Sequence, residues 1–98
     1  MTEARIESLI KETKIRAEKI LKRLLNGHNV NILGWREPID GRYPTLFDKR
    51  LYALDFSVDG KAKESVYFSY KLMCDGRTKN DQNTIENLIK GKIISLML

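Results

Sequence analysis

At 98 residues and 11.4 kDa, the chain has the size of a single domain, 1–98, with one modest core, and its 42% hydrophobic and 32% charged residues argue against disorder. The single cysteine, Cys74, excludes a disulfide, a zinc knuckle and a Cys-x-x-Cys redox pair, and without a long apolar run or secretory signal we expect a cytoplasmic protein with no metal, cofactor or membrane segment. The net charge of +5 and the pI of about 9.4 favour polyanionic partners.

The first predicted element is an amphipathic helix over residues 3–25. Apolar or small side chains recur at steps of three and four, the period of a helix with one buried face: Ile6, Leu9, Ile10, Thr13, Ala17, Ile20, Leu21 and Leu24. Thr2 can cap its start, and Gly27 can adopt the left-handed conformation that ends many helices. Glutamates four residues before a cation, such as Glu18 before Lys22, predict ion pairs on the solvated face.

A short first strand is predicted over residues 28–35. Val30 and Ile32 alternate with asparagines, so we expect them to face the helix. Strict alternation then places Leu33 and Trp35 on the opposite face of the sheet. The odd-numbered residues of the following hairpin would add further apolar surface there: Leu51, Ala53, Tyr67 and Met73.

Residues 36–48 predict a long loop, because Pro38 and Pro44 interrupt a strand ladder and Asp40-Gly41 favours a turn. Two roles are open for it. Its apolar side chains could fold back over Trp35, or the region could dock onto another protein, since aromatic residues and arginine dominate such contacts. The residues of this predicted docking patch are Trp35, Arg42, Tyr43 and Phe47.

Residues 51–73 predict an antiparallel hairpin. Apolar side chains occupy every second position in two runs: Tyr52, Leu54, Phe56 and Val58, then Val66, Phe68, Tyr70 and Leu72. Asp59-Gly60 supplies turn chemistry, but a two-residue loop would pair even positions with odd ones and split the apolar set across both faces. We therefore expect a loop of three or five residues.

A second helix begins at about Asp81 or Asn83, with Ile85, Leu88 and Ile89 as its buried stripe. Continued to Leu98, this helix would contain Gly91 and bring Lys92 to the buried face. If the helix ends at Lys90, residues 93–98 form a final buried strand, which is the arrangement we predict. The expected fold class is α+β: an N-terminal helix on a three-stranded antiparallel sheet, then a short helix and a strand, in the order α-β-β-β-α-β.

Asp55, Ser69 and Lys71 fall on one face of the predicted hairpin. With the element order, segments 54–60 and 66–71 resemble the PD-(D/E)XK nuclease core, which has Asp on its second strand and Glu-x-Lys on its third. The resemblance implies that Asp55 helps hold a divalent cation and that Lys71 activates water. Ser69 replaces the family's second acid, and one carboxylate binds Mg²⁺ poorly, so we expect no nuclease activity.

The helix-strand-strand-strand-helix order also resembles double-stranded RNA-binding domains. Those domains carry a basic cluster at the start of their second helix. Here the corresponding residues, Asn80 to Asn83, are polar without being basic.

Charge is distributed unevenly along the chain. No acid lies between Glu18 and Glu37, so this segment predicts a basic end that could contact a nucleic-acid backbone. Lysines or arginines at the hairpin tip and after the third strand add two more basic points. The predicted nucleic-acid-binding residues are Lys19, Lys22, Arg23, His28, Arg36, Lys61, Lys63, Arg77 and Lys79. The lysines of the helix could instead complement its C-terminal dipole.

The sequence thus favours a small, basic, non-enzymatic protein bound to a nucleic-acid backbone through Lys19 to Arg36. The alternative is an interaction module or inhibitor of the kind that mobile elements encode, docking onto a host protein through residues 35–50. The third possibility is a degenerate nuclease with Asp55 and Lys71 at its site. The sequence does not define an oligomeric state.

Overall fold

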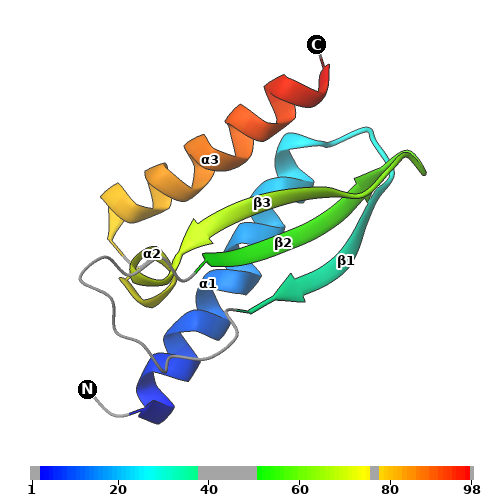
Figure 1. The fold of residues 1–98 in the computed structure, drawn as a ribbon. Coiled ribbons are helices and arrows are strands. Elements are labelled where there is room, and N and C mark those ends of the chain that lie inside the picture. The colour runs from blue at the N-terminus through cyan, green and yellow to red at the C-terminus, as the bar shows by residue number, and fades with distance from the viewer. Residues whose placement is uncertain (1–2, 38–50, 76–77, 98) are drawn as a thin grey trace.

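The computed structural model describes residues 3–37, 51–75 and 78–97. The elements in chain order are α1 (Glu3–Leu24), β1 (Val30–Arg36), β2 (Leu51–Val58), β3 (Glu64–Ser69), α2 (Tyr70–Asp75) and α3 (Lys79–Met97). The strands form an antiparallel sheet in the order β1-β2-β3, and the helices pack against it around one hydrophobic core (Figure 1). The predicted α+β fold is confirmed. None of the helices in the described ranges is long and apolar enough to cross a bilayer.

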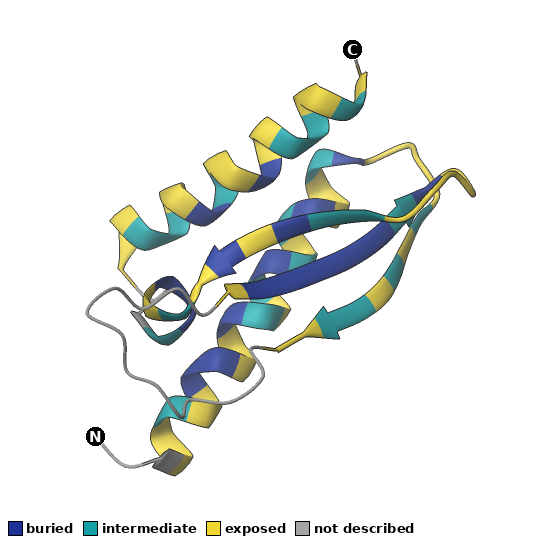
Figure 2. Ribbon diagram, in the orientation of Figure 1, coloured by how far each residue is buried: buried dark blue, intermediate teal, exposed yellow. Residues whose placement is uncertain are grey.

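The amphipathic stripe of α1 faces the sheet as predicted. Leu9, Thr13, Ala17 and Leu21 are all buried, and Figure 2 shows buried patches recurring along this helix. The hydroxyl oxygen of Thr13 lies 2.9 Å from the carbonyl oxygens of both Leu9 and Met73. This buried polar group is therefore satisfied, and it joins α1 to α2.

The hairpin pairs even-numbered residues with even-numbered residues, as the alternation predicts. Tyr52 lies opposite Phe68 and Leu54 lies opposite Val66. The connecting loop holds five residues, 59–63, between the end of β2 and the start of β3. Figure 2 shows that β2, the central strand, is buried along most of its length.

The second strand of the hairpin ends earlier than predicted. Residues Tyr70–Asp75 form the helix α2 instead of extending β3 to Met73. The hydroxyl oxygen of Ser69 accepts a hydrogen bond from the amide of Leu72 at 3.1 Å, which is the geometry of a helix N-cap. Met73 is consequently buried in the core and does not lie on the outer face of the sheet.

A β-bulge in β1 reverses the predicted alternation. Ile32 pairs with Phe56 and Gly34 pairs with Asp55, so Leu33 is an extra residue in the strand. Gly34 has φ +135°, a conformation that favours glycine.

The prediction that Trp35 lies on the outer face is therefore wrong. Beyond the bulge Trp35 pairs with Leu54 and packs against the core, with its ring centroid 5.8 Å from that of Phe68. Its Nε1 donates a hydrogen bond to Glu18 at 3.1 Å. Leu33 remains half exposed.

The predicted final strand is also wrong, because α3 continues as a helix to Met97. Ile85 and Ile89 are buried, and Ile93 and Leu96 continue the same stripe against the core. Lys92 remains compatible with this face because its side chain is only partly exposed and its Nζ forms an ion pair with Glu64 at 3.0 Å.

Gly91→Ala is expected to raise the free energy of unfolding by about 0.5–1 kcal/mol, because alanine costs less backbone entropy in a helix interior. The side of Gly91 where a Cβ would lie is open, so the added methyl group meets no neighbour. Urea unfolding followed by circular dichroism measures this change. Gly34→Ala is the matched control and is expected to destabilise the protein, since φ is +135° there. A loss of stability in Gly91→Ala would contradict a helical segment at residue 91.

Candidate functional site

The predicted basic residues lie at two different ends of the molecule. The C-terminal end of α1, which carries Lys22, and the β2–β3 loop, which carries Lys61 and Lys63, lie toward the same end of the molecule (Figure 1). Lys79 begins α3 at the opposite end, and Arg77 lies outside the described residues.

Acids from distant parts of the chain contact three of the predicted basic residues. Arg23 forms an ion pair with Glu86 of α3. The Nδ1 atom of His28 lies 2.8 Å from a carboxylate oxygen of Asp59. Arg36 is likewise engaged by an acid of β2. The segment without acids in the sequence is therefore not free of acids in space.

Five lysines of α1 and the hairpin loop remain exposed and without an ion pair in the described part of the chain. They are Lys11, Lys19, Lys22, Lys61 and Lys63. Lys22 lacks the predicted ion pair with Glu18, whose carboxylate accepts the hydrogen bond from the Trp35 indole instead.

Lys11 was not predicted as a nucleic-acid-binding residue from the sequence, although the period of the helix places it on the same side as Lys22. At 3.6 residues per turn, Lys11 and Lys22 lie within about 20° of each other around the helix and roughly 16 Å apart along it. Both are on the side of α1 opposite its buried residues, such as Ala17. The solvated face of α1 thus carries an extended row of free ammonium groups.

Asp59 fastens the hairpin loop to the connection between α1 and β1. Its Oδ1 accepts a hydrogen bond from the amide of Asn29 at 2.9 Å, and its own amide donates to the Asn29 carbonyl at 2.8 Å. The hydrogen bonds from His28 and Asn29 hold the pKa of Asp59 below its usual range. Asp59 and Gly60 have φ values of 54° and 73°, and the Lys61 amide donates to Val58 at 3.1 Å, as in a tight hairpin turn.

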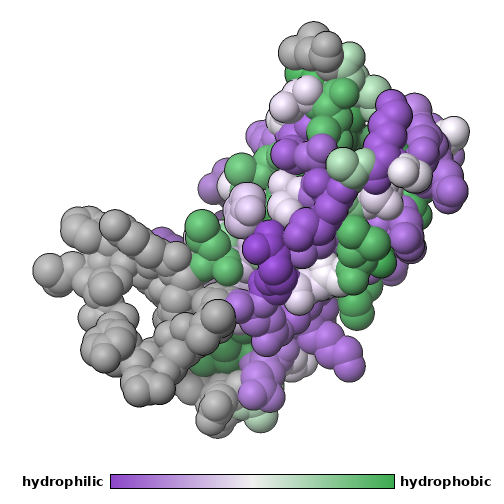
Figure 3. Space-filling view, turned by 45° about the vertical axis from the view of Figure 1, so that its right-hand side comes forward, coloured by the Kyte–Doolittle hydropathy of each residue, from purple (hydrophilic) through white to green (hydrophobic). Residues whose placement is uncertain are grey.

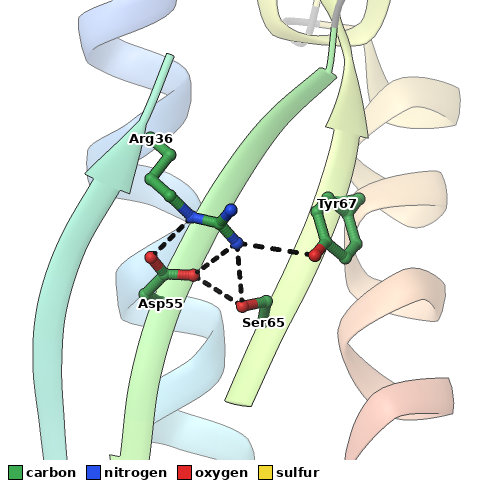
Figure 4. Close-up of polar contacts among 4 residues, drawn as sticks. All are labelled: Arg36, Asp55, Ser65 and Tyr67. Carbon is green, nitrogen blue, oxygen red and sulfur yellow. Dashed lines mark hydrogen bonds and ion pairs between the residues drawn. The ribbon is translucent and has the colours of Figure 1, made fainter. Parts of the chain in front are cut away.

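A second polar cluster crosses the outer face of the sheet (Figure 4). The guanidinium of Arg36 donates to both carboxylate oxygens of Asp55, at 2.9 and 3.1 Å, in a bidentate pair. It also reaches the hydroxyl oxygens of Ser65 at 3.2 Å and Tyr67 at 3.4 Å, while Ser65 donates to Asp55 at 2.6 Å. Arg36 of β1 thereby connects all three strands.

The electrostatics of this cluster follow from the position of Arg36. Its hydrogen bonds hold the pKa of the Asp55 carboxyl below the usual range, although Asp55 is only 7% exposed. The guanidinium also lowers the pKa of the Tyr67 phenol. Because its Nε and one Nη are engaged by Asp55, Arg36 has fewer free donors for a phosphate than an unpaired arginine.

The structure does not reproduce the nuclease arrangement. Lys71 lies in α2, not on β3 beside Asp55, and Ser69 caps that helix. Both carboxylate oxygens of Asp55 are occupied by Arg36, and Oδ1 also by Ser65. Within residues 3–37, 51–75 and 78–97, no group of three acidic, histidine or cysteine side chains could hold a metal ion.

The predicted docking patch loses its central residue, because Trp35 packs inward. Arg42, Tyr43 and Phe47 lie outside the described residues. On the face seen in Figure 3, hydrophilic residues predominate and the hydrophobic residues form separate patches. That view shows no broad apolar surface of the kind that marks a protein-binding site.

The described surface therefore carries unpaired lysines and a polar cluster around Arg36 whose members hydrogen-bond to one another. A search of known family models, curated proteins and solved structures finds no match to this chain.

Proposed function

We propose that the protein binds the phosphate backbone of nucleic acid, without catalysis, through five lysines of α1 and the hairpin loop. They are Lys11, Lys19, Lys22, Lys61 and Lys63. The observation that carries this proposal is that these side chains are exposed and unpaired within the described residues, whereas Arg23 and Arg36 form ion pairs with carboxylates. A free ammonium group can replace the counterions of a phosphate, and the release of those counterions favours binding.

The distribution of charge along α1 supports this proposal. From Lys14 to Leu24 the helix carries five cations, of which Lys14 and Arg23 pair with Glu37 and Glu86, and one acid of its own. That acid, Glu18, is engaged by the indole of Trp35. The C-terminal half of α1 therefore has a positive potential that would attract a polyanion.

The proposal predicts binding that weakens steeply with salt. If about four phosphates are contacted, affinity for a labelled DNA duplex should fall on the order of 100-fold between 50 and 200 mM salt. Fluorescence anisotropy across this range measures the slope. The double substitution Lys19→Ala and Lys22→Ala should weaken binding and reduce the slope of log K against log salt by about 2.

A double substitution at the other end of the molecule serves as the matched control. Lys71→Ala with Lys79→Ala removes the same charge from α2 and the start of α3. This variant should keep the wild-type salt slope. Binding that ignores salt, or an equal loss of slope in both double variants, would contradict the proposed site.

A further inference from the structure

We propose that Asp59 is a positioning residue that fixes the hairpin lysines relative to the α1 lysines, and that this fixed arrangement selects duplex over single-stranded nucleic acid. The inference rests on the proposed function and adds the class of nucleic acid to it. It follows from the contacts of Asp59, from the phosphate spacing of a duplex and from the position of the aromatic side chains.

Asp59 fastens the hairpin loop to the connection between α1 and β1 through both its backbone and its side chain. Its amide and its carboxylate each bond to Asn29, and the second carboxylate oxygen lies 2.8 Å from His28. Asn29 lies immediately before β1. His28 closes the turn after α1, because its backbone N–H donates a hydrogen bond to the Leu25 carbonyl at 3.0 Å. The hairpin loop that carries Lys61 and Lys63 is therefore fastened to the connection that follows α1.

A rigid set of cations is best matched by a partner whose phosphates are equally fixed. A duplex carries one negative charge per roughly 1.7 Å of its axis, against roughly 3.4 Å for each strand. Lys11 and Lys22 alone span roughly 16 Å of α1, so they extend along several phosphates of a duplex. A flexible single strand would have to lose conformational entropy to meet the same set of charges.

Within the described residues, we find no exposed aromatic platform beside these lysines of the kind that single-strand binders use. Such proteins stack bases on exposed aromatic rings, each worth about 1–3 kcal/mol. Among the described aromatic residues, Trp35 and Phe68 pack in or against the core. Tyr67 is 51% exposed, but it lies on the outer sheet face, where Arg36 donates to its hydroxyl oxygen. The described aromatic side chains therefore do little to favour unpaired bases over a duplex.

Asp59→Gly distinguishes the effect of positioning the hairpin lysines from the effect of net charge on binding. Glycine accepts the φ of 54° without strain, so the substitution removes the carboxylate contacts and raises the net charge by one. Charge alone would tighten the binding of every nucleic acid. Our proposal instead predicts about 5- to 10-fold weaker duplex binding with single-strand binding unchanged or tighter, because the hairpin lysines lose their fixed position.

Asp59→Asn is the companion variant, since it makes the same change in charge. Asparagine tolerates a positive φ and keeps an oxygen that can accept the Asn29 amide hydrogen bond. It should bind duplex more tightly than Asp59→Gly does. Circular dichroism of both variants checks that the fold is retained.

The probes are a 20-bp DNA duplex, a 20-bp RNA duplex and a 20-nucleotide single strand, titrated by anisotropy at 50 mM salt. Wild-type preference for duplex by at least about fivefold, lost in Asp59→Gly, supports the inference. The two duplex arms identify DNA or RNA as the source of the phosphates. Equal binding of single strand and duplex, or tighter duplex binding by Asp59→Gly, overturns the inference and leaves the proposed function standing. Binding to none of the probes overturns both.

Discussion

Trp35→Ala is expected to lower the free energy of unfolding by about 2–4 kcal/mol, whereas Leu33→Ala is expected to cost less than about 1 kcal/mol. Trp35 packs against the core beside Phe68, and its indole donates to Glu18 of α1. Truncation would leave a cavity and an unpaired carboxylate between helix and sheet. Leu33 is 50% exposed at the bulge and has little packing to lose.

Urea unfolding followed by circular dichroism measures both variants on the same scale. Strict strand alternation assigns Leu33 and Trp35 to one face and predicts similar, small effects for both. The bulge predicts a large difference between them. If Trp35→Ala kept its unfolding midpoint but lost a binding partner, the docking hypothesis would hold and the inward placement of the ring would be wrong.

Arg36→Ala is expected to destabilise the protein most strongly near neutral pH. The substitution leaves the carboxylate of Asp55, which is 7% exposed, with Ser65 as its remaining side-chain donor. A buried charge that loses its partner is costly to keep ionised. The three strands also lose the guanidinium that joins Asp55, Ser65 and Tyr67.

The pH dependence follows from the lowered pKa of Asp55 in the folded protein, for which Arg36 is the main cause. A carboxyl whose folded pKa is depressed contributes stability above its unfolded pKa, about 3.9, and loses it as pH falls through the folded value. In Arg36→Ala that contribution is gone, and the carboxyl binds a proton more readily. The difference in unfolding free energy between wild type and variant should therefore shrink below about pH 4.

Arg23→Ala provides the comparison, because Arg23 also forms an arginine–carboxylate pair, with Glu86. Its side chain is 63% exposed, and exposed pairs contribute about 0–1 kcal/mol. Thermal unfolding of both variants at pH 3, 5 and 7 would show the contrast. Equal losses in the two variants at every pH would remove the special role of the Arg36 pair.

The sequence could predict those elements whose side chains follow one regular period. The spacing of α1 and the alternation of Leu54, Phe56 and Val66 determine which faces are buried. The helix, the register of the hairpin and the odd number of loop residues could therefore be predicted correctly. The bulge at Leu33 and Gly34 breaks that period, and one glycine inside a strand was its only local signal. Trp35 was consequently assigned to the wrong face.

The last segment shows a different limit. A short apolar run such as residues 93–97 suits a buried strand and a helix equally well. The helix is favoured over the strand because Ile93 and Leu96 continue the buried stripe of Ile89, and because Lys92 forms an ion pair with Glu64 on β3. That ion pair joins residues that are far apart in the sequence, so the residues around Lys92 could not predict it.

The candidate site shows the same distinction between local and distant information. The basic segment after Glu18 was visible in sequence, but the acids that contact it in the fold were not. Arg23 meets an acid 63 residues away, and His28 meets one 31 residues away. Lys11, by contrast, could have been found from the helical period alone.

The inward turn of Trp35 also gives the molecule an internal optical reporter. It is the one tryptophan in the chain, and it sits where β1 meets α1, with the ammonium of Lys14 5.9 Å from its ring. Separation of the helix layer from the sheet would expose the indole to water and shift its emission to longer wavelength. Opening of this interface can therefore be followed in the unlabelled protein.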